Sequence, residues 1–194
     1  MPALVRAAPW AARAALALKE VNFVLIPEAP FSLEGEGGLL PALEERLKSR
    51  GHAVIVAAEG AGQHLLAEQS GTDASGNPVL GDISELLRAF INTYLDARGM
   101  AHSIKYIDPS YIIRSVPANA NDKVYCGFLG QYAVHAAMAG RTDMVVGKIQ
   151  DRYVHLPLEL VTRKRRKLNI YSDLWRAVLE STGQGMLKGM LPPI

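Results

Sequence analysis

The sequence has almost no cysteine, little net charge and no long apolar run. Among its 194 residues there is one cysteine, Cys126, which excludes both a disulfide framework within the chain and a zinc site built on several thiolates. The formal net charge of +2 creates no global field that would recruit nucleic acid or a membrane surface. No apolar stretch reaches the length needed to cross a bilayer. With 49% hydrophobic and 21% charged residues, the composition is that of a globular protein with its own core.

Two segments of unusual amino-acid composition each allow two interpretations. The segment from Met1 to Glu20 is rich in alanine and has no acidic residue before Glu20. It fits either an organelle transit peptide or a first amphipathic helix, and the strand expected directly after it favours the helix. The basic run "RKRRK", Arg163 to Lys167, is typical of a solvated face and less often of a phosphate or nucleic-acid patch. Because it has no interleaved aromatic residues, we expect no nucleic-acid partner.

Short apolar runs alternate with helical patterns along the rest of the chain. Strands are predicted at 21–28, 53–60, 103–108 and 143–150, with 153–157 either extending the last one or forming a hairpin arm; helices are predicted at 37–52, 82–98, 121–140 and 172–182. Such alternation indicates right-handed crossovers and a mostly parallel sheet with helices on both faces. The predicted fold class is therefore α/β, a three-layer sandwich.

In a parallel sheet, ligands bind beyond the carboxyl ends of the strands. That edge would carry Pro27 and Glu28 after the first predicted strand, residues 59–63 after the second and 108–114 after the third. Polar side chains follow each strand, so this edge is the expected position of a ligand site.

The stretch "AAEGAGQ", Ala57 to Gln63, combines a carboxylate with two glycines. Glu59 could accept hydrogen bonds from sugar hydroxyls, and Gly60 and Gly62 would let a ligand approach the backbone. Alternatively, Glu59 could pair with a nearby lysine or cap a helix. The glycine spacing is not that of the dinucleotide-binding fingerprint.

The stretch "YIIR", Tyr111 to Arg114, follows Pro109 in what the sequence predicts to be a stiff polar loop. A tyrosine hydroxyl and a guanidinium three residues apart can converge on one anion, and the planar arginine fork matches phosphate oxygens. A salt bridge from Arg114 to Asp108 or Asp122 is the alternative. Lys105 would lie near the same edge. The sequence contains no nucleophile elbow, no Walker-type loop and no histidine spacing that supplies a general base.

Several of these segments resemble one known family. "LIPEAPF", "AVIVAAEGAGQ", "DLWRAVLESTGQ" and the long block "KYIDPSYIIRSVPANANDKVYCGFLGQYAVHAAMAG" are similar to the carboxyl-terminal half of 6-phosphofructokinases. The closest type is the ATP-using branch related to pyrophosphate-dependent enzymes. The resemblance runs from about Val21 to Gln184. It implies a phosphofructokinase-like fold, with residues 21–194 forming the fructose 6-phosphate-binding domain and residues 1–20 an atypical first helix.

The resemblance also implies a function and a site. Members of the family transfer a phosphoryl group from ATP, with Mg²⁺, to fructose 6-phosphate in glycolysis, giving fructose 1,6-bisphosphate. Glu59 matches the glutamate that binds the sugar. Tyr111, Ile112, Ile113 and Arg114 match the segment that grips the 6-phosphate, with Arg114 as the charge partner. Lys105 falls where related enzymes place a basic residue on the substrate phosphate.

The chain also departs from the family pattern. The Gly-Gly-Asp-Gly phosphate loop and the Thr-Ile-Asp segment that carries the catalytic base are absent, and residues 3–5 do not match the Met-Gly-Arg motif. We therefore expect the sugar-phosphate half of the enzyme, as a fragment or an incompletely predicted gene product, with no catalytic residue, metal ligand or donor site. We expect this chain alone to be inactive, to form a homo-oligomer or pair with an intact subunit, and to lie in the cytoplasm or a plastid.

Overall fold

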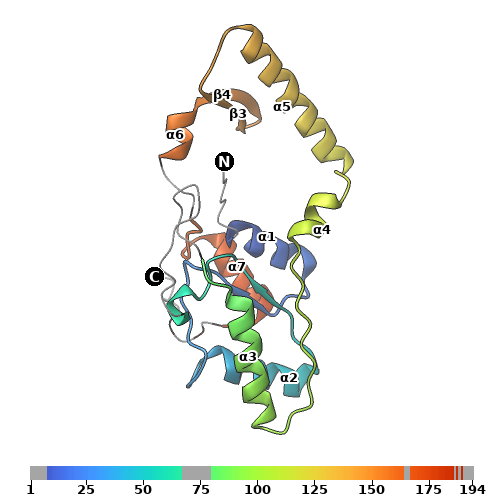
Figure 1. Ribbon diagram of the computed structural model, residues 1–194, viewed down its shortest axis with the longest axis vertical. Coiled ribbons are helices and arrows are strands. Elements are labelled where there is room, and N and C mark those ends of the chain that lie inside the picture. Colours follow the sequence, from blue (N-terminus) through green and yellow to red (C-terminus); the bar gives the residue numbers. More distant parts are fainter. Residues whose placement is uncertain (1–7, 67–79, 164–166, 186, 188, 190–194) are drawn as a thin grey trace. The chain divides into compact units, whose positions relative to one another are not determined.

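The structure is a computed structural model that describes residues 8–66, 80–163, 167–185, 187 and 189. The chain divides into two compact units, one formed by Met1–Tyr106 with Arg166–Ile194 and the other by Ile107–Arg165 (Figure 1). We call them unit 1 and unit 2 and describe each by itself. No helix within the described residues is both long and apolar enough to cross a membrane.

Unit 1 is built around a parallel pair of strands. Strands β1 (Phe23–Leu25) and β2 (Ile55–Ala57) pair in parallel, with Leu25 opposite Ala57. The crossover between them contains helix α2 (Leu39–Arg50). The remaining elements are α1 (Ala8–Leu18), the short 3₁₀ turn η1 (Gln63–Leu65), α3 (Ile83–Asp96) and α7 (Asp173–Thr182). A parallel pair joined through a helix is the βαβ unit that the sequence predicted, and the α/β fold class is thereby confirmed.

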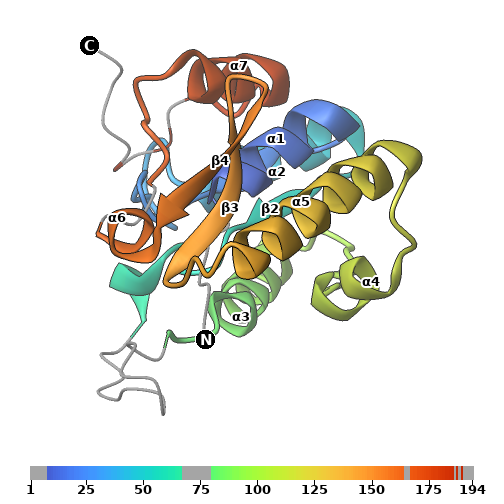
Figure 2. The same cartoon turned by 90° about the horizontal axis from the view of Figure 1, so that it is seen from above.

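The core of unit 1 brings together both ends of the chain. Helix α1 contacts α7, β1 and β2, and α7 also contacts β1; Figures 1 and 2 both show α1 beside α7. On α1 the buried residues are alanines at positions 8, 11, 12 and 15, and this small face allows close packing. All three residues of β1 are buried. The helix predicted for the first segment is therefore formed and is part of the core.

Local capping signals fix the helix ends in unit 1. Gly51 ends α2 in the left-handed conformation, with φ of 74°, which favours glycine. The Asp82 side chain accepts a hydrogen bond from Ser84 N and starts α3, and the Ser172 side chain accepts one from Trp175 N and starts α7. The sequence predicts Gly51 as the end of the first helix, Asp82 or Ser84 as the start of the second and Ser172 or Asp173 as the start of the third; the structure selects Asp82 and Ser172.

Unit 2 contains an antiparallel hairpin and three helices. These are α4 (Ser110–Ser115), α5 (Ala120–Met138) and α6 (Leu158–Thr162), with strands β3 (Met144–Ile149) and β4 (Arg152–Pro157). Gln150 and Asp151 form the two-residue turn of the hairpin with φ of 45° and 67°. Residues 153–157 thus form a hairpin arm, one of the two alternatives predicted for them.

Two expectations from the sequence are wrong. Residues 103–108 form no strand, because a strand needs a partner and neither β1–β2 nor β3–β4 includes this segment. Tyr111 to Arg114, expected in a loop, lie in α4, which begins directly after Pro109.

Candidate functional site

Glu59 lies at the corner of a tight turn directly after β2. Ala61 N donates to Ala58 O over 2.9 Å, and Gly60, the third residue of this turn, has a φ of 85°. A positive φ at that position is what a type II turn requires, which explains the Glu-Gly pair in the sequence. The turn lifts the Glu59 side chain out of the sheet, and the residue is exposed. With the described residues it makes no hydrogen bond or ion pair, so neither alternative role, lysine pairing or helix capping, is seen among them.

The loop that carries Glu59 is fastened at its far end. Gln63 Nε2 donates to Gly81 O and Gly81 N donates to Gln63 Oε1, both over 2.9 Å. His64 Nε2 lies 2.8 Å from Phe31 O. These bonds tie the loop to the start of α3 and to the segment after β1, which holds the Glu59 backbone in place. Sequence reasoning missed this role of Gln63, because its partner is eighteen residues away and no local pattern joins them.

Glu28 follows β1 at the same edge of the parallel pair. Ala29 N donates to Ile26 O over 3.2 Å, so Glu28 also lies in a turn beyond its strand. Both of its carboxylate oxygens are buried and have no hydrogen-bond partner among the described residues. Burying a carboxylate without a partner is costly. Glu28 and Glu59 lie at the same edge of the parallel pair, as predicted. Of these two carboxylates, that of Glu28 is buried, and Glu59 is exposed and therefore accessible to a ligand.

The predicted phosphate segment lies in unit 2. Ile112, Ile113 and Arg114 are exposed on α4, with exposed fractions of 57% and 67% for the two isoleucines. Arg114 is in the last turn of this helix. The backbone of Tyr111 is helical, and its side chain lies outside the described residues. Lys105 is exposed in the segment that leads to unit 2.

The predicted residues therefore fall into two groups. Glu59 belongs to unit 1, and Tyr111 to Arg114 belong to unit 2. Each group has a defined local conformation. Most of the basic run, residues 164–166, lies outside the described residues.

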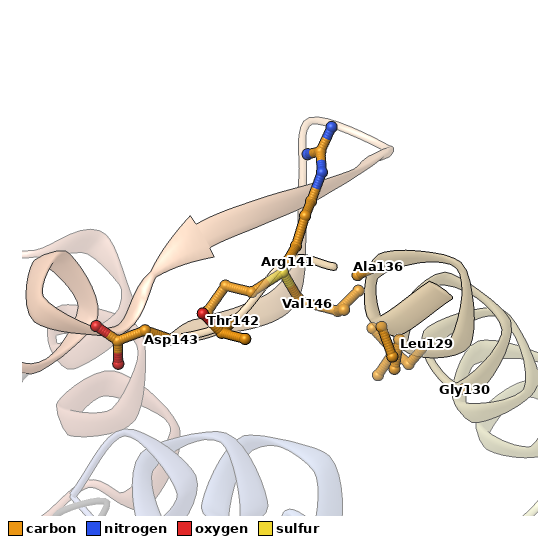
Figure 3. Close-up of a pocket in the computed structure, with 10 residues that line it drawn as sticks. Leu129, Gly130, Ala136, Arg141, Thr142, Asp143 and Val146 are labelled. Atoms are coloured by element: carbon orange, nitrogen blue, oxygen red, sulfur yellow. The ribbon is translucent and has the colours of Figure 1, made fainter. Parts of the chain in front are cut away.

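A pocket in unit 2 is separate from all of these residues. It has a volume of about 500 Å³ and lies between α5 and the start of β3 (Figure 3). The α5 side consists of small and apolar residues such as Leu129, Gly130 and Ala136. On the other side, the Arg141 side chain points away from the helix in Figure 3 and its Nη1 lies 3.0 Å from His155 Nδ1. Thr142 and Asp143 also line this side, so the pocket has one apolar wall and one polar wall.

The described residues offer no evident metal centre. No three histidine, cysteine, aspartate or glutamate side chains within the described ranges lie close enough together to hold a metal ion. The Mg²⁺ that the family resemblance implies therefore has no cluster of ligands in this part of the chain, and we derive no chemical step through it.

Comparison with known proteins identifies relatives of the chain. No family model matches it. An ATP-dependent 6-phosphofructokinase from Amycolatopsis methanolica is 52% identical over 181 residues, covering 90% of this chain and 39% of the relative. The chloroplastic ATP-dependent 6-phosphofructokinase 4 of Arabidopsis thaliana is 44% identical, covering 88% of this chain and 33% of the relative.

One solved structure is also similar, the pyrophosphate-dependent phosphofructokinase from Marinobacter aquaeolei. It is 18% identical with a TM-score of 0.47, covering 96% of this chain and 55% of that chain. The chain spans 39% and 33% of the length of the two curated relatives named above. The resemblance found in the sequence is confirmed: over about nine tenths of its length this chain is related to the ATP-dependent 6-phosphofructokinases.

Proposed function

We propose that this chain binds fructose 6-phosphate as the sugar-phosphate part of an ATP-dependent 6-phosphofructokinase. The observation that carries the proposal is the position of Glu59. It is exposed at the carboxyl end of a parallel strand, on a turn that glycine and Gln63 hold in place, and the chain is related to 6-phosphofructokinases on both sides of it. An exposed carboxylate in a fixed turn is suited to accept hydrogen bonds from sugar hydroxyls.

Arg114 supplies the charge for the 6-phosphate in this proposal. Its guanidinium can donate two parallel hydrogen bonds to phosphate oxygens, and it lies one turn after the tyrosine of the same segment. Ile112 and Ile113 take part through the position of the backbone. Lys105 adds a second positive charge to the substrate phosphate.

The chemistry of the whole enzyme is phosphoryl transfer to the 1-hydroxyl of the sugar. Such transfer depends mostly on positioning and on charge stabilisation around the metal-bound phosphates. The residues proposed here bind and orient the acceptor sugar. ATP and Mg²⁺ would be held by parts of the enzyme that this chain does not match.

The remaining expectations follow from the same relationship. We propose a role in carbohydrate metabolism and assembly with further copies or with an intact subunit. The compartment is the cytoplasm, or a plastid as the names of two relatives state for those proteins. Allosteric control belongs to the family and is proposed for the assembled enzyme.

A second candidate is a non-catalytic sugar-phosphate-binding or regulatory module. The observation that favours it is the coverage of 39% of the relative from Amycolatopsis methanolica. Co-purification of the chain with an intact 6-phosphofructokinase subunit, followed by a steady-state assay of the complex, separates the two candidates. Turnover in the complex that Glu59→Ala lowers would support the sugar-phosphate part of the enzyme, and co-purification with turnover unchanged by Glu59→Ala would support the module.

Calorimetric titration with fructose 6-phosphate tests the proposed binding. We expect Arg114→Ala to weaken binding at least about tenfold, because a charge-assisted hydrogen bond contributes about 1.5–3 kcal/mol. Arg163→Ala is the matched control, since this exposed arginine of unit 2 pairs with Glu159, and it should leave the affinity unchanged. Equal affinity for wild type and Arg114→Ala would refute the phosphate role of Arg114.

A further inference from the structure

The two edges of strand β1 have different hydrogen-bond partners. Phe23 N donates to Val54 O over 3.1 Å and Leu25 O accepts from Ala58 N over 2.8 Å, so these two residues bond on the side of β2. Val24, between them, bonds at the opposite edge. Because buried backbone groups need partners, another part of unit 1 has to supply them there.

The side chain of Gln184, after α7, supplies both partners. Val24 N donates to Gln184 Oε1 over 2.7 Å, and Gln184 Nε2 donates to Val24 O over 3.4 Å. An amide side chain carries both an acceptor and a donor, so it bonds to β1 as the backbone of a neighbouring strand would. Gln184 is buried, its N donates to Thr182 Oγ1, and Thr182 Oγ1 donates to Val178 O over 2.8 Å. The amide is thus held in place against the end of α7.

The same C-terminal segment also contacts the residues that follow β1. Gly189 has a φ of 101°, and a Cβ added there would lie 3.2 Å from Pro30 O and 3.3 Å from Phe31 Cα. The absence of a side chain allows this close approach of two backbones. Leu187, between the two contacts, is 2% exposed and belongs to the core of unit 1. The segment after α7 is therefore fastened to β1 and to the residues beyond it.

The loop that presents Glu59 is bonded to the same backbone at both of its ends. Ala58 N, just before Glu59, donates to Leu25 O. His64 Nε2, at the far end, lies 2.8 Å from Phe31 O. Leu25 directly follows the strand residue that the side-chain amide holds, and Phe31 is one of the two residues on which the C-terminal glycine is packed. Both anchors of the loop are therefore next to contacts made by the C-terminal segment.

We propose that Gln184 is a positioning residue of the candidate site, because its amide fixes β1 and β1 fixes the turn that presents Glu59. The proposal deepens the proposed function and rests on it for the ligand, fructose 6-phosphate. Strand β2, which Glu59 follows, pairs with β1 and with no other described strand. Groups that bind a ligand have to be held within about 0.5 Å by their supporting hydrogen bonds, and here that support passes from Gln184 through β1.

Hydrogen exchange of the chain without ligand tests the positioning independently of the sugar. Gln184→Met keeps the length of the side chain and removes its amide, so both backbone groups of Val24 lose their partner. We expect the amides of Val24, Ala58 and Ala61 to exchange at least about tenfold faster, because a hydrogen bond lost from a buried group favours local opening. The interior amides of α3, in the same unit, should change less than about twofold.

Thr182→Val is a milder second variant. It removes the hydroxyl that accepts from Gln184 N and leaves the bonds between Gln184 and Val24 in place, so the same amides should exchange faster by a smaller factor. Ile91→Val, on the buried face of α3, is the control for a general loss of stability, and it should not single out the turn at Glu59. Circular dichroism of the three variants checks that they fold.

Calorimetric titration then measures the consequence for the ligand. We expect Gln184→Met to bind fructose 6-phosphate at least about fivefold more weakly than wild type, because Glu59 is no longer held in place. Ile91→Val should bind as wild type does. A wild-type chain that does not bind would refute the proposed function, whereas the exchange rates would still decide the positioning role of Gln184.

Three results would overturn the proposal. The first is unchanged exchange at Ala58 and Ala61 in Gln184→Met, which would show that the turn does not depend on the amide. The second is equal acceleration at these amides and throughout α3, which would make Gln184 a contributor to stability alone. The third is a wild-type affinity for fructose 6-phosphate that Gln184→Met leaves unchanged.

Discussion

Single residues decide the shape of the loop that presents Glu59. Gly60 and Gly62 both have positive φ, 85° and 67°. They differ in their surroundings, because a Cβ on Gly62 would lie 2.6 Å from Ile83 Cδ1 and 3.4 Å from Phe31 Cζ. Gly62 is therefore constrained by its backbone conformation and by packing, and its replacement tests both constraints.

Gly62→Ala should lower the free energy of unfolding more than Gly51→Ala. Both glycines have a φ near 70°, 67° and 74°, and a left-handed alanine costs about 1–2 kcal/mol. A Cβ at Gly51 would meet no atom within 4 Å, so this variant isolates the backbone cost. At Gly62 the buried Ile83 must also move, which adds about 1–3 kcal/mol of overpacking.

Urea denaturation of the wild type and both variants measures the difference. Equal loss of stability in Gly62→Ala and Gly51→Ala would show that the contact with Ile83 does not constrain the loop. The Gln63 hydrogen bonds would then be what fixes the position of Glu59.

At the scale of elements, α2 and α3 are joined by a cluster of polar groups around Glu44. Its carboxylate accepts from Tyr94 Oη over 2.9 Å and lies 2.6 Å from both Lys48 Nζ and Arg98 Nε. The Arg98 guanidinium also lies 3.5 Å from the centre of the Tyr94 ring. The hydrogen bonds from Lys48 and Tyr94, with the charge of Arg98, lower the pKa of Glu44.

This pKa shift makes the link between α2 and α3 dependent on pH. The pKa of Glu44 is lower in the folded chain than its ordinary value of 4.5. The stabilisation is therefore present above that value and is lost as the pH falls through the folded-state pKa. Glu44→Gln should lower the urea midpoint at pH 7 and have progressively less effect as the solution is acidified.

Urea titrations of wild type and Glu44→Gln across this pH range test the prediction. Glu45→Gln is the matched control, because the neighbouring Glu45 is exposed and makes no ion pair or hydrogen bond with the described residues. A loss of stability in Glu44→Gln that is the same at pH 7 and in acid would contradict the electrostatic origin of the link.

The elements also show what the sequence can and cannot predict. Helix ends at Gly51, Asp82 and Ser172 were predictable because capping depends on residues next to each other in the chain. The segment 103–108 has the composition of a strand but forms none, because pairing depends on a distant partner. The short helix α4 was missed because six residues are too few for helical periodicity to be recognised.

For the whole molecule, the two units differ in how much surface they bury. Unit 1 has a hydrophobic core that includes β1, α1 and α7, whereas Ala136 is the single buried residue described in unit 2. The sequence contains no sign of the division into units. That division arises from packing between distant segments, which no local pattern encodes.

The candidate residues fall in both units. The sequence identified Glu59 and the segment from Tyr111 to Arg114 separately, from the chemistry of each stretch and from family resemblance. They are over fifty residues apart in the chain, so no local pattern joins them. We propose that they bind the same fructose 6-phosphate.

Hydrogen exchange with and without fructose 6-phosphate tests this claim most directly. At saturating ligand, we predict slower exchange in two segments of the wild-type chain, the turn at 59–63 and helix α4. Fructose, which lacks the phosphate, should protect neither, and Arg114→Ala should abolish the protection in both. Protection of one segment only, or of neither while calorimetry shows binding, would contradict a single sugar-phosphate site formed by Glu59 and Arg114.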